Sequence, residues 1–179
     1  MRILLILFIF LAACTNSENK IHSKTYYDLA GLLNQQITEL SAKKPMVEKT
    51  LAVKDKNERI ETKDIDWNKE LELFLQADLN KQSYQSAYLV DTKDKKLTYQ
   101  LKEGEKMPVK QLTIEFDAND LPKHIEASMN TNNYLYESDK KLSADFADNK
   151  LKNYKIEGYQ QLFIGEKKPF SVEGKIKGD

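Results

Sequence analysis

The sequence predicts an α+β fold, in which two N-terminal helices pack on a mostly antiparallel meander sheet of about seven to nine strands. Apolar residues recur with a helical period of about 3.6 as far as Asn80, and with a period of about 2 beyond it. The alternating segments are joined by short turns rich in Asp and Asn, and such turns connect antiparallel strands. A strongly twisted meander of this kind could also curve into a half-barrel.

The first helix is expected from about Tyr26 to Ala42. Thr25 and Asp28 form a start similar to a capping box, and Pro45 cannot continue a helix. The apolar stripe of this helix consists of Tyr26, Leu29, Ala30, Leu33, Ile37 and Leu40. A strand at 46–54 and a weaker partner strand at 59–63 follow, with a turn between them.

The second helix is expected to begin after Asp66, whose side chain can cap it, and to end at Asn80. Its apolar stripe consists of Trp67, Leu71, Phe74, Leu75 and Leu79.

The rest of the chain predicts a sheet with one buried and one solvated face. Strict alternation marks strands around Tyr88–Val90, Leu97–Leu101, Leu112–Phe116, Ile125–Met129, Tyr154–Ile156 and Phe170–Ile176. In the last of these, Val172 and Ile176 are expected to face the interior. The segment from Leu142 to Phe146 fits either a further strand or a short helical turn.

The N-terminus carries an apolar run from Ile3 to Ala13, which is shorter than the roughly 20 residues of a membrane-spanning helix. Arg2 precedes the run, and the small-residue pattern Leu11-Ala12-Ala13 closes it, as in a secretory signal. Cys14, the only cysteine in the chain, follows at once.

This segment resembles the signal peptide of bacterial lipoproteins, in which an aliphatic residue and two small residues precede a cysteine. The resemblance implies that residues 1–13 are a signal peptide and that Cys14 is lipidated. It also implies that the lipid on Cys14 anchors the chain in a membrane. Residues 14–22 are polar without periodic apolar residues and are expected to form a flexible tether, and the remaining length suits a single α+β domain at residues 23–179. The alternative is a plain secretory signal with a chance cysteine.

The residues that follow Cys14 indicate which membrane of the cell envelope the protein is sorted to. In the enteric sorting rule, aspartate after the lipidated cysteine retains a lipoprotein at the inner membrane, whereas Thr15 stands here. Only Glu18 is acidic between Thr15 and Lys20, so the acidic run typical of surface-exported lipoproteins of the Bacteroidota is missing. We therefore expect an outer-membrane location facing the periplasm. The Lys-, Asn- and Tyr-rich body also looks like small lipoproteins of the Bacteroidota.

The charge balance and the composition argue against several classes of partner and site. Lys and Arg number 28, as do Asp and Glu, and this balance argues against a nucleic-acid partner. The two histidines, His22 and His124, cannot build a zinc site with the lone cysteine, and no Gly-x-Ser-x-Gly elbow is present. Asp117 to Asp120 fits a turn better than a calcium loop. We expect no enzyme activity, no metal and no cofactor.

The predicted function is a membrane-anchored, non-enzymatic module that binds an apolar or amphiphilic ligand or an envelope partner. Trp67 and Phe74 would line its pocket, with Tyr134, Tyr136 and Tyr154 at the rim. The alternative is that these aromatic residues simply fill the core. The architecture is loosely similar to the periplasmic carriers and receptors of lipoproteins, which hold acyl chains in a half-barrel closed by helices. The second hypothesis for the function is an assembly factor of the cell envelope, and the third is a hydrolase that uses carboxylates.

Overall fold

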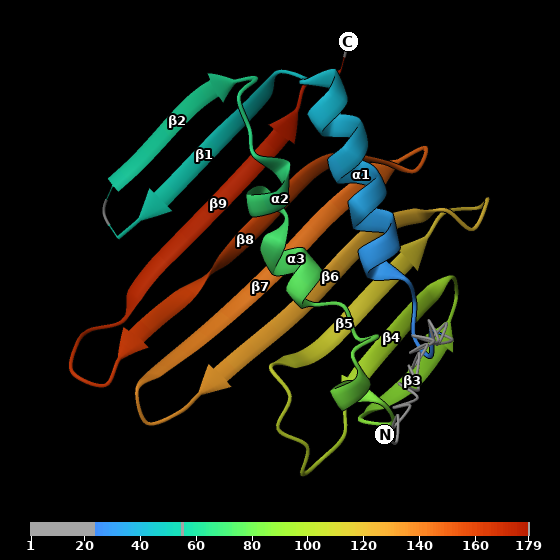
Figure 1. Ribbon diagram of the computed structural model, residues 1–179, viewed down its shortest axis with the longest axis vertical. Helices are drawn as coiled ribbons and strands as arrows, with labels where there is room; N and C mark the ends of the chain where they lie inside the picture. Colours follow the sequence, from blue (N-terminus) through green and yellow to red (C-terminus); the bar gives the residue numbers. More distant parts are fainter. Residues whose placement is uncertain (1–23, 55, 179) are drawn as a thin grey trace, which may run out of the picture.

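The computed structural model describes residues 24–54 and 56–178, and in it the strands form one open antiparallel sheet (Figure 1). The strand order is β2-β1-β9-β8-β7-β6-β5-β4-β3. Paired strands are consecutive in the sequence except for β9 and β1, and the consecutive strands β2 and β3 lie at opposite edges. The strands are β1 (Val47–Val53), β2 (Lys56–Thr62), β3 (Tyr88–Lys93), β4 (Lys96–Leu101), β5 (Val109–Phe116), β6 (Pro122–Asn132), β7 (Tyr136–Ala147), β8 (Lys150–Leu162) and β9 (Lys168–Ile176).

The helices lie along one face of this sheet (Figure 1). They are α1 (Leu29–Lys43), α2 (Trp67–Glu70) and α3 (Glu72–Gln76), followed by a single 3₁₀ turn at Gln82–Tyr84. The predicted class, helices on an antiparallel meander, is confirmed. None of the helices in the described ranges is both long and apolar enough to cross a membrane.

The first helix begins three residues later than predicted, because Asp28 caps it rather than Thr25. The Asp28 carboxylate accepts a hydrogen bond from the Gly31 N–H at 2.9 Å. The backbone just before Asp28 makes its hydrogen bonds outside the helix, because the Tyr27 N–H donates to the Tyr99 hydroxyl at 2.8 Å. The C-terminal end agrees with the prediction: Lys44 adopts a left-handed conformation and its N–H donates to the Leu40 carbonyl, just before the proline.

The second predicted helix is wrong as a single element, because it is divided at Leu71 into α2 and α3 and ends at Gln76. Asp66 caps α2 as expected, accepting from the Lys69 N–H at 3.3 Å. Leu79, the last residue of the expected stripe, is fully buried, but it stands three residues beyond the end of α3.

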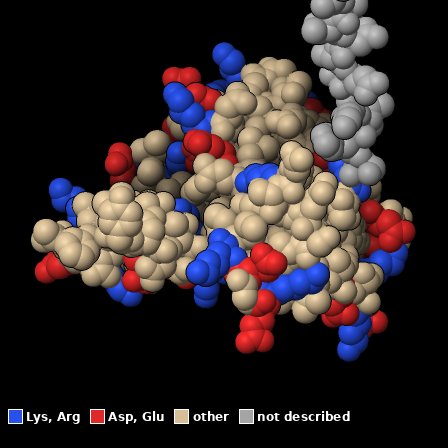
Figure 2. All heavy atoms as spheres, turned by 60° about the horizontal axis from the view of Figure 1, so that its bottom comes forward, with Lys and Arg blue, Asp and Glu red and all other residues tan. Residues whose placement is uncertain are grey.

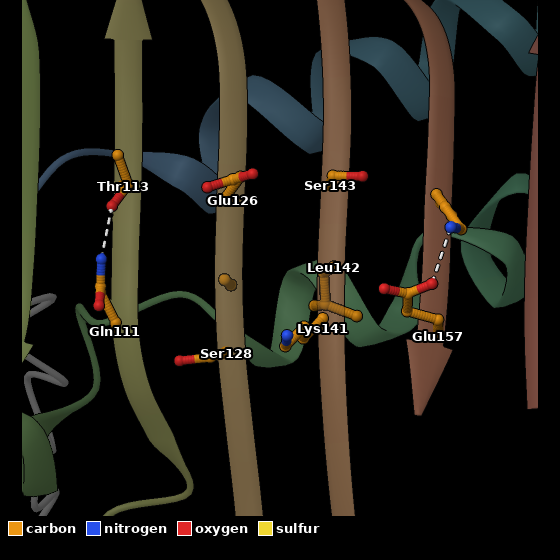
Figure 3. A pocket seen from close by; sticks show the side chains of 10 residues that line it. Gln111, Thr113, Glu126, Ser128, Lys141, Leu142, Ser143 and Glu157 are labelled. Atoms are coloured by element: carbon orange, nitrogen blue, oxygen red, sulfur yellow. Dashed lines mark hydrogen bonds and ion pairs between the residues drawn. The ribbon is translucent and has the colours of Figure 1, made fainter. Parts of the chain in front are cut away.

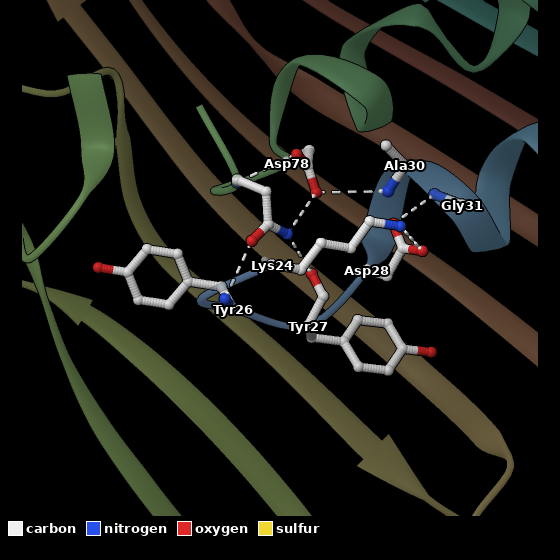
Figure 4. Close-up of polar contacts among 8 residues, drawn as sticks. Lys24, Tyr26, Tyr27, Asp28, Ala30, Gly31 and Asp78 are labelled. Carbon is white, nitrogen blue, oxygen red and sulfur yellow. Dashed lines mark hydrogen bonds and ion pairs between the residues drawn. The ribbon is translucent and has the colours of Figure 1, made fainter. Parts of the chain in front are cut away.

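Polar contacts fasten the end of this second segment to the start of α1 (Figure 4). The Asn80 side chain accepts a hydrogen bond from the Tyr26 N–H and donates to the Tyr27 carbonyl, both at 2.9 Å. The Asp78 carboxylate accepts from the Ala30 N–H at 3.3 Å. These bonds satisfy backbone groups at the helix N-terminus that would otherwise lack partners.

Most strands of the meander have the predicted alternation, but in edge strand β3 Val90, expected on the buried face, is 56% exposed because no further strand or helix of the described chain covers it. In β7, Leu142, Ala144 and Phe146 are buried, which settles the open choice for this segment in favour of a strand. Val172 and Ile176 in β9 pack against the core from partly buried positions, so the predicted register holds. Strands β2 and β3 form the two edges, and the sheet does not close.

The core between α2 and the sheet centres on Tyr154 of β8, which is 1% exposed. Its ring meets that of Trp67 edge to face, with 6.2 Å between centroids. Its hydroxyl donates to the Glu70 carboxylate at 2.7 Å, and Lys49 of β1 donates to the other oxygen of that carboxylate at 2.6 Å. Gly174 in β9 lies against the ring, and a Cβ atom there would overlap it.

This close approach makes Gly174→Ala destabilising. The added methyl must displace a buried, hydrogen-bonded tyrosine, and overpacking of this kind costs about 1–3 kcal/mol. Gly178→Ala is the matched control, since a Cβ atom there would meet nothing within 4 Å. Urea denaturation of the two variants should show a lower midpoint only for Gly174→Ala. Equal midpoints would mean that the Tyr154 ring moves aside freely.

Candidate functional site

The five aromatic residues expected to form one ligand site are divided by the structure into two groups. Trp67 and Phe74 are 2% and 1% exposed, and with Tyr154 they belong to the packed core. These three residues line none of the surface hollows described below. Tyr134 and Tyr136 lie instead at the connection between β6 and β7, where they are 83% and 37% exposed.

The β6–β7 turn is held in shape by Asn133, whose side-chain oxygen accepts the N–H groups of Leu135 at 2.9 Å and Tyr136 at 3.1 Å. The Asn133 N–H in turn donates to the Tyr136 carbonyl at 3.0 Å. Asn commonly makes such bonds with its own turn, as the Asn-rich sequence here predicts. The side chains at the end of this turn are therefore directed outward by a fixed backbone.

The β8–β9 turn lies beside it and carries three consecutive apolar residues. Tyr136 and Leu162 are register partners, and the Phe163 N–H donates to the Leu135 carbonyl at 2.8 Å. Phe163 and Ile164 are 80% and 85% exposed. We call the joint surface of the two turns the apolar tip; it consists of Tyr134, Leu135, Tyr136, Leu162, Phe163 and Ile164.

The apolar tip concentrates the exposed apolar surface of the described chain. Six of the ten large hydrophobic side chains that are exposed within residues 24–54 and 56–178 belong to it. In Figure 2, where the lower end of Figure 1 is turned forward, the lobe that projects to the left is mostly uncharged, with charged side chains at its margins. An exposed patch of this kind indicates an interaction site or a ligand surface.

Polar groups surround the tip. The Lys167 ammonium lies 4.1 Å from the centre of the Tyr159 ring, and the Tyr159 hydroxyl donates to the Glu137 carboxylate. The carboxylate raises the pKa of Tyr159, so the hydroxyl stays protonated and keeps donating at neutral pH. Lys54, at the end of β1, donates its backbone N–H to the Pro169 carbonyl at 3.2 Å and adds a second cation on this side.

A second surface is a hollow of about 300 Å³ on the sheet face opposite the helices (Figure 3). Short side chains of β5, β6 and β7 form its floor, among them Thr113, Ser128 and Ser143. Glu126, Lys141, Lys155 and Glu157 stand around them. The Lys155 ammonium lies 2.7 Å from Glu157 and lowers the pKa of that carboxyl, so Glu157 is an ionised, paired group.

A shallow extension of about 430 Å³ continues this hollow toward β9 and β1. It shares Lys141 and Glu157 with the first hollow and is lined further by Tyr159 and Phe170. In the described part of the chain, no group of three or more His, Cys, Asp or Glu residues is placed to hold a metal ion. Asp117 behaves as a turn residue, because its carboxylate accepts the N–H groups of Asn119 and Leu121 at 2.8 and 3.0 Å.

His124 lies at the margin of the hollow, on the same strand as Glu126. Its ring contacts the Asp145 carboxylate of β7 through Nδ1, and its Nε2 lies 3.3 Å from Glu126. Partial burial by itself would lower the pKa of His124, but the bonds to Asp145 and Glu126 outweigh burial and raise it. Glu115, opposite on β5, is paired with Lys96 at 2.9 Å.

Cys14 lies outside the described residues. The sequence predicted Tyr134 and Tyr136 as site residues, but at the rim of a pocket. Leu162, Phe163 and Ile164 were not among the predicted site residues. The signal for these three was present, since three large apolar residues in succession break the alternation of β8 just before Gly165. Comparisons of this chain with protein-family models, with curated proteins and with solved structures find no match.

The contacts of His124 predict a pH dependence of stability. Because its folded-state pKa is raised, its contribution is complete below the unfolded pKa of about 6.5 and is lost as the pH rises through the folded-state value. Wild type should therefore exceed His124→Gln in unfolding free energy by more at pH 5 than at pH 8. Urea melts at both values measure this.

The Asp145→Asn variant is the control for this effect. In its background the carboxylate that His124 contacts is gone, so the pH dependence of the His124→Gln difference should shrink. An equal difference at pH 5 and pH 8 in the wild-type background would contradict the prediction, because it would show that folding leaves the pKa of His124 unchanged.

Proposed function

We propose that this protein is a lipid-anchored, non-enzymatic binding protein of the bacterial cell envelope, and that the apolar tip is its binding surface. The observation that carries this proposal is the tip itself: two hydrogen-bonded turns present six large apolar side chains to solvent. Anchoring is supported by the lipoprotein-like sequence from Leu11 to Cys14. Two or more acyl chains attach a protein stably to a membrane without a spanning helix.

Binding at a surface fits the packing better than binding in a cavity. A carrier that holds acyl chains in a half-barrel needs open apolar space between helices and sheet. Here Trp67, Phe74 and Tyr154 occupy that space as buried core residues. An apolar or amphiphilic partner would instead meet Tyr134 and the neighbouring side chains of the tip, without unpacking the core.

A hydrolase that uses carboxylates has less support. The hollow on the open face brings together Glu126 and Glu157, but a general acid needs a carboxyl that keeps its proton near neutral pH. Lys155 lowers the pKa of Glu157 instead. An assembly role remains within the proposal, because a protein partner could occupy the same apolar tip.

For location we propose the outer membrane, with the domain facing the periplasm. Thr15 in place of aspartate and the lack of an acidic run after Cys14 support this assignment. Membrane attachment would then depend on the lipid, and the helices of the described domain would lie outside the bilayer.

The test of anchoring is Cys14→Ser in the full chain. We expect loss of incorporated labelled palmitate and a shift of the protein from the membrane fraction to the soluble fraction, or accumulation of the unprocessed precursor. Ser17→Ala, three residues further on, is the matched control and should leave labelling and fractionation unchanged. Palmitate labelling that survives Cys14→Ser would refute the lipid anchor.

A further inference from the structure

The shape and size of the apolar tip restrict what can cover it. It projects from the ends of two neighbouring hairpins and carries six apolar side chains. A standard protein interface uses about 20–30 residues from each partner. The tip would supply only part of such an interface, whereas it is large enough to enter the boundary region of a lipid bilayer, where a few apolar and aromatic side chains suffice for attachment.

Several backbone groups of the tip are hydrogen-bonded within the protein, which lowers the cost of entering a low-dielectric environment. Backbone groups that enter lipid must be hydrogen-bonded within the protein, since no water is present to bond them. The N–H groups of Leu135 and Tyr136 are bound by Asn133, and the Phe163 N–H is bound by the Leu135 carbonyl. The Gly165 carbonyl accepts from the Gln161 side chain at 3.1 Å. Each turn is therefore held by bonds of its own, and the bond from Phe163 to Leu135 joins the two.

The residues around the tip match the chemistry of a membrane boundary. Tyr134 and Tyr136 combine an apolar ring with a hydroxyl, as do the aromatic residues that gather at headgroup depth. Lys167 lies in the β8–β9 turn and Lys168 begins β9, and such long side chains can extend toward lipid phosphates. Glu137 and Glu166 offset these charges, so attachment would depend on apolar contact more than on electrostatics.

We propose that the apolar tip inserts into the interfacial region of the membrane that carries the protein, as a second point of attachment beside the lipid on Cys14. This proposal rests on the proposed function and names the occupant of the same surface. A tethered domain meets its own membrane at high effective concentration, so even weak insertion would be occupied most of the time. Two separate contacts would hold the domain in one orientation, with the hollow of the open sheet face in a fixed relation to the bilayer.

A single thiol at the tip tests insertion directly. Cys14 is the only cysteine, so Cys14→Ser combined with Ile164→Cys leaves one labelling site, which can carry an environment-sensitive bimane. The matched control is Cys14→Ser with Leu89→Cys on edge strand β3, where the native side chain is also exposed. Both full-length chains share the same N-terminus, so any contribution of that segment is equal in the two.

Vesicles of phosphatidylethanolamine and phosphatidylglycerol are then added to each labelled chain. We expect a blue shift and protection from iodide quenching at position 164, and neither at position 89. Phosphatidylcholine vesicles and 0.5 M salt should leave most of the signal. Adding Leu162→Ser and Phe163→Ser to the Ile164→Cys chain should weaken vesicle partition at least about tenfold, since each removes a large apolar group. The thermal melt should be unchanged, because both native side chains are exposed.

Two results would contradict membrane insertion of the apolar tip. No change at position 164 would overturn membrane insertion and leave a protein partner as the occupant of the tip. Equal changes at positions 164 and 89 would also overturn it, since they indicate adsorption without a preferred surface. Neither result alters the palmitate experiment on Cys14, so failure of insertion and failure of the lipid anchor can be told apart.

Discussion

The structure depends on covering one apolar sheet face with very little helix. Nine strands present their inward side chains to α1 and two short helical pieces, and an uncovered sheet face of that size would not be stable in water. The short pieces cannot hold themselves in place by helix propensity. Asp78 and Asn80 therefore fix the chain after α3 to the start of α1, and Glu70 links α2 to Tyr154 and Lys49 across the sheet.

Much of this fold is predictable because the period of apolar residues is a direct record of burial. The change from helical spacing to alternation after Asn80 places most strands of the meander, and caps such as Asp66 mark helix starts. The division at Leu71 and the early end of α3 are not predictable in the same way. They depend on the burial of Leu79 and on the bonds of Asn80 to Tyr26 and Tyr27, and these bonds join residues that are far apart in the sequence.

The candidate site is harder to predict from the sequence than the fold is. Aromatic side chains favour strands, cores and binding surfaces alike, so composition cannot separate Trp67 in the core from Tyr134 at a turn. What separates them is position relative to the strand ends, which requires the correct register and turn lengths. A more reliable signal was the interruption of alternation at Leu162 to Ile164, because strand residues beyond the covered part of a sheet have no structural need to be apolar.

The strand order also has a consequence for how the chain is made. The last strand, β9, lies between β8 and β1, so the β1–β2 hairpin gains its place in the sheet only after the C-terminus has been synthesised. Until then β1 exposes an unpaired edge, and the β3–β8 meander can assemble alone from local contacts. A ribosome stalled before β9, or a chain truncated there, would leave β1 and β8 each with an unpaired strand edge that can pair with other chains. Chaperones and proteases recognise species of this kind.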